Sequence, residues 1–418
     1  MNRESRYLTA EDAAKELGVS HATLYAYVSR GLIRSEAIGG DKRARRYSAE
    51  DVQRLRERKE NRSNPSRVAA SALHWGAPVL DSAITLIADG RLFYRGQDAR
   101  ELARSRSVED VATLIWTGDL DANSRTSFDS AAGQMSVRSR RILKRLGDLT
   151  PVEKFHVMLP LEAVEDLAAY DLRAASVRQT GARILKLMAI ITSGKLLRKM
   201  EGSIAETIQQ GWLPKNPEAA SLISAALILC ADHELNVSSF AARTVASAGS
   251  TLYAVVLAGL AALQGTRHGG HSERVEAFLR EAGNPDDARR IITGRLKRGE
   301  RIPGFGHRLY PDGDPRARAL LEWTAQTCPN SPAVALSMAV AQSVYDTIGR
   351  YPALDFGLAA VSQTLGLPPG GAVALFAMGR TIGWIGHALE QYQIDRMIRP
   401  RARYVGDQPH DLEASSDL

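Results

Sequence analysis

The chain is poor in cysteine and lacks a long uninterrupted apolar segment. Only two cysteines, Cys230 and Cys328, occur in 418 residues. Neither a disulfide framework nor a cysteine-rich zinc site is therefore expected, and the cytoplasm is the natural compartment. The charged N-terminus lacks the apolar stretch of a secretory signal. The most apolar run, Leu252–Leu263, is too short to cross a bilayer and predicts a buried core helix, so no membrane partner is expected.

Several common signatures are also absent. The sequence contains no GxGxxG, no Walker A loop, no CxxC and no HExxH. A nucleotide-binding fold or a zinc protease therefore has no support, and neither a cofactor nor a metal is expected. The hydrophobic share of 44% and the charged share of 24% are ordinary for a globular protein. A chain of this length is expected to form two or three domains.

Positive charge is concentrated near the N-terminus. Residues 1–65 hold 14 Lys and Arg against 10 Asp and Glu, and so contribute +4 of the net charge of +7. More than half of the excess therefore lies in less than a sixth of the chain. Such an asymmetry indicates a small basic module that meets nucleic acid.

The first 60 residues predict a winged helix-turn-helix domain. Thr9 is a suitable N-cap and Gly18 a suitable end for a first helix, and Ser20 can cap a second helix that ends near Gly31. Two short helices around such a turn form a helix-turn-helix, whose second helix enters the major groove of DNA. The side chains expected on its exposed face, beside Ser20, are His21, Thr23 and Tyr27.

A basic hairpin follows this helix pair. The turn at Gly39-Gly40 is flanked by cations expected to grip phosphates, namely Lys42, Arg43, Arg45 and Arg46. Over about 50 residues the pattern resembles the winged-helix domains of MerR-type regulators and excisionase-like proteins. The alternative is a small helical module that docks on its own protein or on a partner. Residues 61–68 are polar, contain a proline and predict a linker.

From residue 69 onward the pattern is mostly helical, so an all-α fold is expected. A short hairpin is predicted around Asp89-Gly90, which lies between two apolar runs. The predicted helices span 181–199, 219–232, 239–264, 273–282, 315–327, 331–349 and 370–392.

The chemically interesting residues fall into four clusters near the C-terminal half. They comprise three histidines, one carboxylate and several arginines: His233, His268, His307, Asp355, Arg316, Arg380 and Arg399. Guanidinium groups bind carboxylates in a bidentate manner, so the arginines suit a substrate with two or three carboxylates. Histidine and aspartate suit proton abstraction beside a carbonyl. Because Arg380 lies in an apolar helix, it also requires a buried anionic partner.

These clusters, in this order, resemble citrate synthase over residues 70–410. The shared motifs are HELN, GxxHGG, PGFGHRLY with GDPRA, LDF, GRTIGW and RPRARYVG. The resemblance implies an all-α fold with a large domain (69–267 and 366–418) and a small domain (268–365), and an active site between them. It also implies a homodimer with shared sites that condenses acetyl-CoA with oxaloacetate.

The resemblance further implies a role for each motif residue. Asp355 removes a proton from the acetyl-CoA methyl group, His268 stabilises the enol, and His307 protonates the oxaloacetate carbonyl. The residues that hold the oxaloacetate carboxylates are His233, Arg316, Arg380 and, from the neighbouring subunit, Arg399. The loop implied to cradle CoA consists of Pro303, Gly304, Phe305 and Gly306.

The chain departs from the family pattern in two places. His271-Ser272 stands where the family usually has Ala-Asn, and Gly357-Leu358-Ala359 stands where many members have Tyr-Ser-Gly. The second departure is expected to alter the wall near the acyl group. One alternative function is therefore a 2-methylcitrate synthase that uses propionyl-CoA. Another is a DNA-binding regulator that uses the synthase body as a metabolite sensor.

Overall fold

The computed structural model describes residues 7–38, 41–49, 51–53, 55–56, 80–124, 128–129, 131, 134–196, 200 and 202–407; for 37–38 and 41–44 it describes the backbone alone. The chain divides into two compact units, Met1–Asp81 and Ser82–Leu418. The predicted linker, 61–68, and the predicted turn at Gly39-Gly40 lie outside the described residues.

The first unit is a helix pair with a small antiparallel sheet. Its elements are β1 (Tyr7–Leu8), α1 (Ala10–Leu17), α2 (His21–Ser29), β2 (Ser35–Ile38) and β3 (Asp41–Ser48). The sheet has the order β1-β3-β2. Its core is formed by Ala13, Ala14, Leu17, Leu24, Ile33, Tyr47 and Val52.

The helix ends of this unit confirm the sequence signals. The Thr9 side chain accepts a hydrogen bond from Asp12 N at 3.1 Å, and Gly18 ends α1 in the left-handed conformation with φ 58°. Ser20 caps α2 by accepting from Thr23 N at 3.3 Å. Local capping chemistry therefore defines both ends of the turn between the two helices.

The second unit begins with the predicted hairpin. Strands β4 (Thr85–Ala88) and β5 (Arg91–Tyr94) pair in antiparallel fashion, and β6 (Gln97–Asp98) adds a short third strand. Asp89 and Gly90 have φ values of 50° and 71°. Two consecutive positive values are the signature of the tight turn that Asp-Gly favours.

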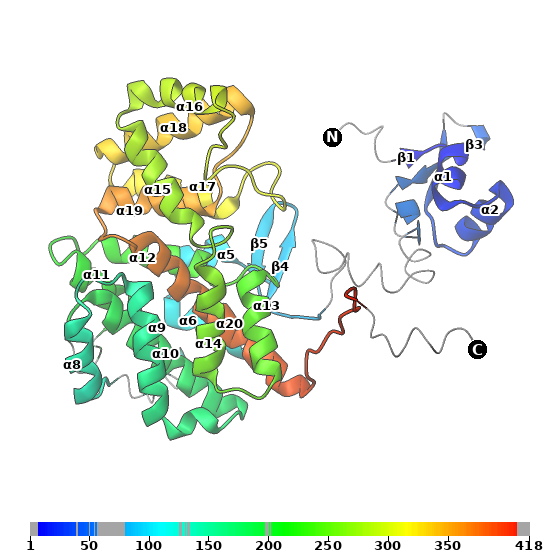
Figure 1. Ribbon diagram of the computed structural model, residues 1–418. Helices are drawn as coiled ribbons and strands as arrows, with labels where there is room; N and C mark the ends of the chain where they lie inside the picture. The colour runs from blue at the N-terminus through cyan, green and yellow to red at the C-terminus, as the bar shows by residue number, and fades with distance from the viewer. Residues whose placement is uncertain are drawn as a thin grey trace. The chain divides into compact units, whose positions relative to one another are not determined.

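Helices form most of the rest of this unit (Figure 1). Their bounds are α5 (Ala99–Ser105), α6 (Val108–Thr117), α8 (Val137–Arg145), α9 (Pro151–Glu165), η2 (Leu167–Tyr170), α10 (Ala174–Ser193), α11 (Ile204–Trp212), α12 (Ala219–Leu229), α13 (Val237–Ser247), α14 (Leu252–Leu263), α15 (His271–Ala282), η3 (Pro285–Asp287), α16 (Ala288–Lys297), α17 (Pro315–Thr327), α18 (Pro332–Ile348), α19 (Leu354–Leu365) and α20 (Gly371–Ile394). The helix predicted at 315–327 is confirmed. The single helix predicted at 239–264 is wrong, because a bend at Gly249 (φ 74°) divides it into α13 and α14.

Two hydrophobic cores lie in this unit. The larger one includes side chains of α6, α9, α10, α12, α14 and α20. The smaller one is formed by α15, α16 and α18, joined by Phe356 and Ala359 of α19. Figure 1 shows α15, α16 and α18 together at one end of the unit. The members of the smaller core all fall between residues 268 and 365, whereas the domain boundaries themselves stay predictions.

Helix α20 is the central element of the larger core. It is long and apolar enough to cross a membrane, but it is buried inside the protein, as a core helix is. Its glycines permit close contact with α12, since a Cβ at Gly379 or at Gly383 would lie 2.4 Å from the carbonyl oxygen of Leu227 or Ala231. The backbones of the two helices therefore approach more closely than side chains would allow.

The contact between α14 and α20 generates a stability prediction. A Cβ at Gly259 would lie 2.4 Å from Cδ2 of the buried Trp384 ring. We therefore expect Gly259→Ala to lower the free energy of unfolding by about 1–3 kcal/mol through overpacking, measured by chemical denaturation. Gly294→Ala in α16 is the matched control, because the nearest atom there is Arg298 Nη1 at 3.5 Å. That control should gain about 1 kcal/mol from helix propensity; equal effects would contradict the packing explanation.

Candidate active site

Two histidines and a tyrosine form the first part of the site. His233 follows α12 and is only 8% exposed. Its Nε2 lies 3.2 Å from the Tyr310 hydroxyl oxygen. The ring of His307 lies 5.2 Å from that of His233 and 4.9 Å from that of Tyr310. The Gly/Pro loop before α17 thus returns His307 and Tyr310 to the end of α12.

Beside them, Arg316 forms a buried ion pair at the start of α17. Its Nε and Nη2 donate to the two carboxylate oxygens of Asp314 at 2.9 and 2.8 Å. Asp314 Oδ2 also accepts from Leu354 N at 3.1 Å, which connects the start of α17 to the start of α19. Burial alone would raise the pKa of Asp314, but Arg316 lowers the pKa below its ordinary value.

Arg380 is a buried cation without a carboxylate partner among the described residues. It is 1% exposed, its Nε donates to Cys230 O at 2.8 Å, and its guanidinium lies 5.0 Å from the Phe376 ring centroid. Burial lowers the pKa of Arg380, and Asp232 opposes this only from beyond ion-pair distance. The described part of the protein therefore does not supply the expected buried anionic partner. An anion supplied by a ligand would satisfy this charge.

His268 lies in the turn between α14 and α15. Its Nε2 is 2.7 Å from Ser238 Oγ, which also accepts from Trp384 Nε1 at 3.2 Å. Ser238 Oγ is in addition 2.8 Å from Asn236 Oδ1. Ser238 Oγ is the donor in its contact with Asn236, and a hydroxyl has one hydrogen, so His268 Nε2 carries the ring proton while that bond is made. The proton lies on Nδ1, where a ligand could accept it, when the hydroxyl turns to donate to Nε2 instead.

Asp355 lies in the first turn of α19 and is partly exposed. Ser272 Oγ donates to Asp355 Oδ1 at 2.6 Å. The removal of water around this carboxyl raises its pKa, whereas Ser272, His271 and Arg316 act in the opposite direction. The result is a carboxylate that is more basic than usual, as a proton-abstracting group should be.

The loop Ile302–Gly306 adjoins this carboxylate. Gly304 N donates to His271 Nε2 at 3.1 Å, and Gly304 O accepts from Ala353 N at 2.8 Å. The Phe305 ring lies 4.7 Å from that of Phe356. Because both polar backbone groups of Gly304 are already used, the predicted CoA cradle stays a prediction that has to rely on other groups of the loop.

The histidines of the site are neutral near pH 7. Burial lowers the pKa of His268 and of His307 to about 4. Burial and the nearby charges of Arg316 and Arg380 hold the pKa of His233 well below its ordinary value. Neutral imidazoles can donate or accept single hydrogen bonds without adding to the positive charge of the arginines.

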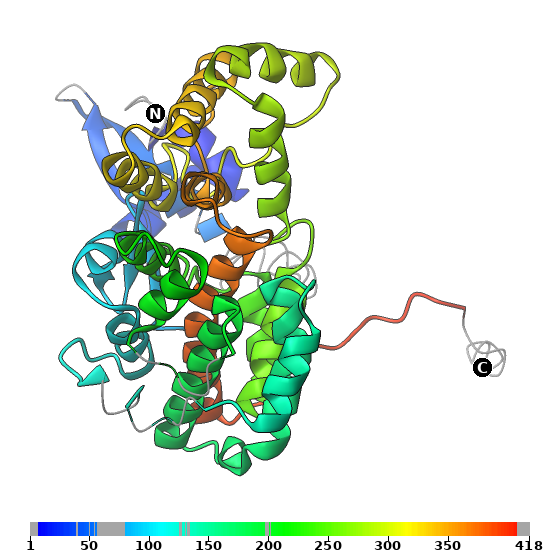
Figure 2. The ribbon, with the colours of Figure 1, turned by 90° about the vertical axis from the view of Figure 1, so that its left-hand side faces the viewer.

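Of the predicted site residues in this unit, Arg399 alone is remote. It is exposed on the segment that follows α20, which extends away from the helices (Figures 1 and 2). Five of the others share neighbours: Tyr310 contacts His233, His307 and Arg316, and Phe376 contacts His268 and Arg380. Ser238, Ser272, Asp314 and Tyr310, which contact these side chains, are not among the site residues predicted from the sequence. The proximity of Ser238 and Tyr310 to predicted histidines within the same motifs was the available signal.

Gly357-Leu358-Ala359, which was expected to alter the wall near the acyl group, packs against other helices instead. A Cβ at Gly357 would lie 3.1 Å from Ala317 Cα, so this glycine permits α19 to pack closely on α17. Leu358 belongs to the larger core and Ala359 to the smaller one. This segment therefore serves the packing between helices.

The first unit presents only part of the predicted DNA-binding set. His21 is exposed, whereas Thr23 is half-buried at the Ser20 cap and Tyr27 packs against the core. The aromatic ring that is exposed on α2 is Tyr25, at 53%. The expectation for Tyr27 was wrong by half a helical turn, since Tyr27 lies on the side of Leu24.

The basic strand β3 contains the remaining predicted contacts. Arg45 and Arg46 are exposed, and Arg46 Nη2 pairs with Glu36 at 3.2 Å while its guanidinium covers the Tyr7 ring at 4.5 Å. Lys42 and Arg43 lie on the same strand, and their side chains are outside the described part. Arg46 therefore already has an acidic partner that a phosphate would have to displace.

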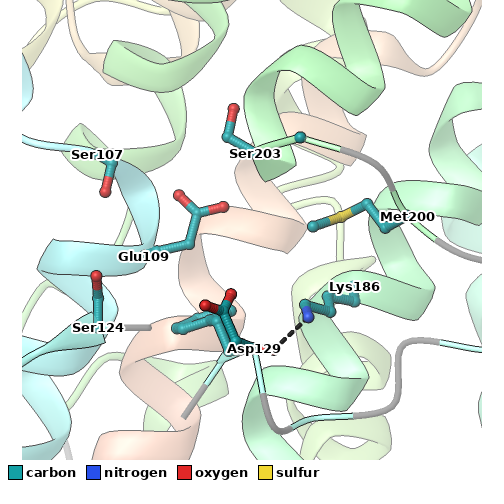
Figure 3. A pocket seen from close by; sticks show the side chains of 9 residues that line it. Ser107, Glu109, Ser124, Asp129, Lys186, Met200 and Ser203 are labelled. Atoms are coloured by element: carbon teal, nitrogen blue, oxygen red, sulfur yellow. Dashed lines mark hydrogen bonds between the residues drawn. The ribbon is translucent and has the colours of Figure 1, made fainter. Parts of the chain in front are cut away.

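A cavity of about 640 Å³ lies apart from these residues (Figure 3). Glu109 and Lys186 line it, but Glu109 accepts from Ile204 N at 2.8 Å and Lys186 Nζ donates to the carbonyl oxygens of Phe128 and Ala131. None of the predicted catalytic side chains lines it. Glu109 and Lys186 are thus occupied by contacts that hold the surrounding backbone.

Comparisons with known proteins identify the family. The model for the citrate synthase C-terminal domain matches residues 72–401, and a helix-turn-helix domain model matches residues 7–60. Citrate synthase 2 of Bacillus subtilis is 30% identical over 354 residues, which cover 79% of this chain and 94% of that protein. A 2-methylcitrate synthase of Mycobacterium tuberculosis is 29% identical over 77% of this chain and 86% of its own length.

Among solved structures, the citrate synthase of Thermotoga maritima matches with a TM-score of 0.69 and 28% identity, over 80% of this chain and 95% of that one. The fold is thus the mostly helical one of citrate synthases, preceded by a helix-turn-helix domain. The chain belongs to the citrate synthase family. It is an enzyme of the citrate synthase type.

The lowered histidine pKa values generate a prediction on stability and pH. In the unfolded chain, His268 and His307 take up protons near pH 6.5, whereas in the folded chain they do so near pH 4. Between these values the unfolded state binds more protons, so the free energy of unfolding should fall as the pH falls from 6.5 to 4. We expect roughly 1–2 kcal/mol for each histidine, allowing for partial exposure.

Denaturant titrations of His268→Gln and His307→Gln measure this effect. Each variant should show a shallower loss of stability between pH 6.5 and 4. The same variants at pH 8, where the native rings are neutral in both states, report the packing cost separately. An unchanged pH dependence in both variants would exclude these histidines as its origin.

Proposed function

We propose that the chain condenses acetyl-CoA with oxaloacetate and then hydrolyses the citryl thioester to citrate and free CoA. The observation that carries this proposal is that the site contains both a basic, partly exposed carboxylate, Asp355, and a buried cation, Arg380, that no described carboxylate balances. Such an arrangement suits a proton-abstracting step on one substrate and an anionic second substrate.

In this proposal Asp355 takes the proton from the methyl group of the acyl thioester. His268 Nδ1 donates a hydrogen bond to the thioester oxygen, which requires the Ser238 hydroxyl to turn from Asn236 Oδ1 and donate to Nε2. His307, whose Nδ1 accepts from Leu309 N at 3.2 Å, keeps its proton on Nε2 and donates it to the oxaloacetate carbonyl as the new bond forms. Neutral donors are preferable here, because the charge to be stabilised appears only in the transition state.

Oxaloacetate is held by the cationic part of the site. Arg380 and Arg316 take its carboxylates, with His233 as a further hydrogen-bond partner. The exposed Arg399 completes the site of the neighbouring subunit, so we propose a homodimer that works in the cytoplasm. Acyl-CoA rests against the loop Pro303–Gly306, and closure around the substrates excludes water before the enol forms.

Only a small difference in binding free energy distinguishes acetyl-CoA from propionyl-CoA. The additional methylene group of propionyl-CoA is worth ~0.8 kcal/mol of transfer free energy, or about a fourfold change in affinity. We therefore expect activity also with propionyl-CoA in place of acetyl-CoA. A 2-methylcitrate synthase is among the relatives, in agreement with this expectation. For the first unit we propose binding of duplex DNA through α2 and the cations of β3, with Tyr25 added to the predicted set.

Release of free CoA by the purified chain tests the enzyme function. Release should require both oxaloacetate and an acyl-CoA, and Asp355→Asn should lower kcat by about 10²–10⁴-fold because the base is lost. Asp346→Asn, which alters an exposed carboxylate of α18, is the matched control and should leave kcat unchanged. Calorimetry with oxaloacetate should show that Asp355→Asn still binds it. Binding without turnover in the unaltered chain would instead favour the metabolite-sensor function.

Fluorescence anisotropy with a labelled 20-base-pair duplex tests DNA binding by the full chain. Arg45→Ala should weaken binding and reduce the slope of log affinity against log salt by about 0.9, the value for one phosphate contact. Arg104→Ala removes an equally exposed cation from α5 of the second unit and should change neither quantity. Absence of binding at low salt would refute a DNA-binding role.

A further inference from the structure

One short segment reaches three parts of the site. In the five residues from His268 to Ser272, the first contacts Ser238 of α13 and the last contacts Asp355 of α19. His271, between them, accepts from Gly304 N in the loop Pro303–Gly306. His271 and Ser272, which form the first of the two departures from the family pattern, therefore contact the loop and the base.

We propose that Ser272 and His271 are positioning residues, of which Ser272 orients the Asp355 carboxylate and His271 fixes the loop Pro303–Gly306 beside it. This inference rests on the proposed function, because it assigns the residues that prepare the base and the acyl-CoA loop of that same site. Neither side chain takes part in the bond changes.

The geometry at Ser272 specifies what it does. Its side chain is fully buried, and the hydroxyl donates to Asp355 Oδ1 at 2.6 Å. Oδ2 is thereby left as the oxygen that would take the proton. A donated hydrogen bond also favours the ionised carboxyl and opposes the effect of burial.

Other groups act on the same carboxylate from the surrounding elements. They are His271 at the start of α15, Arg316 and Asp314 at the start of α17, and Cys230 after α12. Asp314 is already paired with Arg316, which leaves Ser272 as the direct hydrogen-bond donor to Asp355 among the described residues. Its removal should therefore change the proton affinity of Asp355 more than it changes the binding of oxaloacetate.

His271 acts on the loop in a corresponding way. Its Nε2 accepts from Gly304 N at 3.1 Å. The opposite side of the loop is bonded to the segment before α19, since Gly304 O accepts from Ala353 N and Gly306 N donates to Tyr351 O, both at 2.8 Å. The loop is thus held at the same time by the segments that open α15 and α19.

The loop has little room to settle elsewhere. Gly304 has φ 83°, and a Cβ there would lie 3.0 Å from Val275 and 3.2 Å from Phe356. If the His271 contact is removed, Gly304 N loses its partner and the position of the loop relative to Asp355 is no longer fixed. The expected consequence is weaker acyl-CoA binding with little change for oxaloacetate.

The first test compares Ser272→Ala with Ser337→Ala. Ser337 is a matched control because it is a buried serine whose hydroxyl has no partner among the described residues. Ser272→Ala should move the acid limb of kcat/KM for acyl-CoA upward by about one pH unit, with a loss that approaches tenfold on the acid side of that limb and an unchanged KM for oxaloacetate. Ser272→Thr, which retains a hydroxyl, should restore most of the loss.

A measurement without substrates separates this inference from the proposed function. Carboxyl ¹³C NMR of aspartate-labelled protein, assigned with Asp355→Asn, should show that Asp355 titrates at higher pH in Ser272→Ala than in Ser337→Ala. An equal titration in both would overturn the role of Ser272, whether or not the protein turns over. A shifted titration in a protein with no turnover would support Ser272 and reject the condensation.

The second test compares His271→Ala with His156→Ala. His156 is the matched control because it is a half-buried histidine whose Nε2 has no partner among the described residues. His271→Ala should raise KM for acyl-CoA about tenfold and leave KM for oxaloacetate within twofold. Hydrogen exchange of the loop amides should accelerate in the same variant and not in the control. Equal effects on both KM values, or an unchanged exchange rate, would overturn the role of His271.

Discussion

The buried ion pair between Asp314 and Arg316 is the contact on which the rest of the site depends. Moving two charges away from water is costly, and the cost is offset only where the geometry is good and every remaining polar atom has a partner. Asp314 meets this condition because its Oδ2 also accepts the amide of Leu354. One carboxylate thereby orients a substrate-binding arginine and fixes the start of the helix that presents Asp355. The two proposed substrates meet at a single rigid anchor.

Around this anchor the protein combines cations with neutral histidines. Arg316 and Arg380 are both buried, and their charges, together with the loss of water, keep His233 unprotonated. If these rings were charged, the repulsion would weaken the arrangement before any substrate arrived. Because they are neutral, they can be placed within ring contact of each other and of Tyr310. Two buried arginines that can bind an anion are therefore surrounded by neutral histidines that can donate single hydrogen bonds.

The extent to which the sequence predicts this structure depends on the range of the signals. Features set by adjacent residues were predictable, such as the Thr9 and Ser20 caps, the Asp89-Gly90 turn and α17. Features set by tertiary contacts were not: the bend between α13 and α14, the packing role of Gly357, and the inward direction of Tyr27. In the site, the motifs predicted a set of candidate residues, whereas Ser272 and His271 contact two of them, Asp355 and Gly304, across 83 and 33 positions of sequence. Such partners become visible only once the helices are assembled.

The close approach of α20 to α12 has a consequence for how this family member can change over time. Gly379 and Gly383 flank Arg380, and neither has space for even a methyl group beside the carbonyl oxygens of α12 and Ala231. A substitution at either position would push the helix outward and withdraw the guanidinium from Cys230 O. The position of the Arg380 guanidinium therefore depends on two residues that have no side chain. Drift at these glycines would remove the ability to hold a polycarboxylate while every charged residue of the site remained in the sequence.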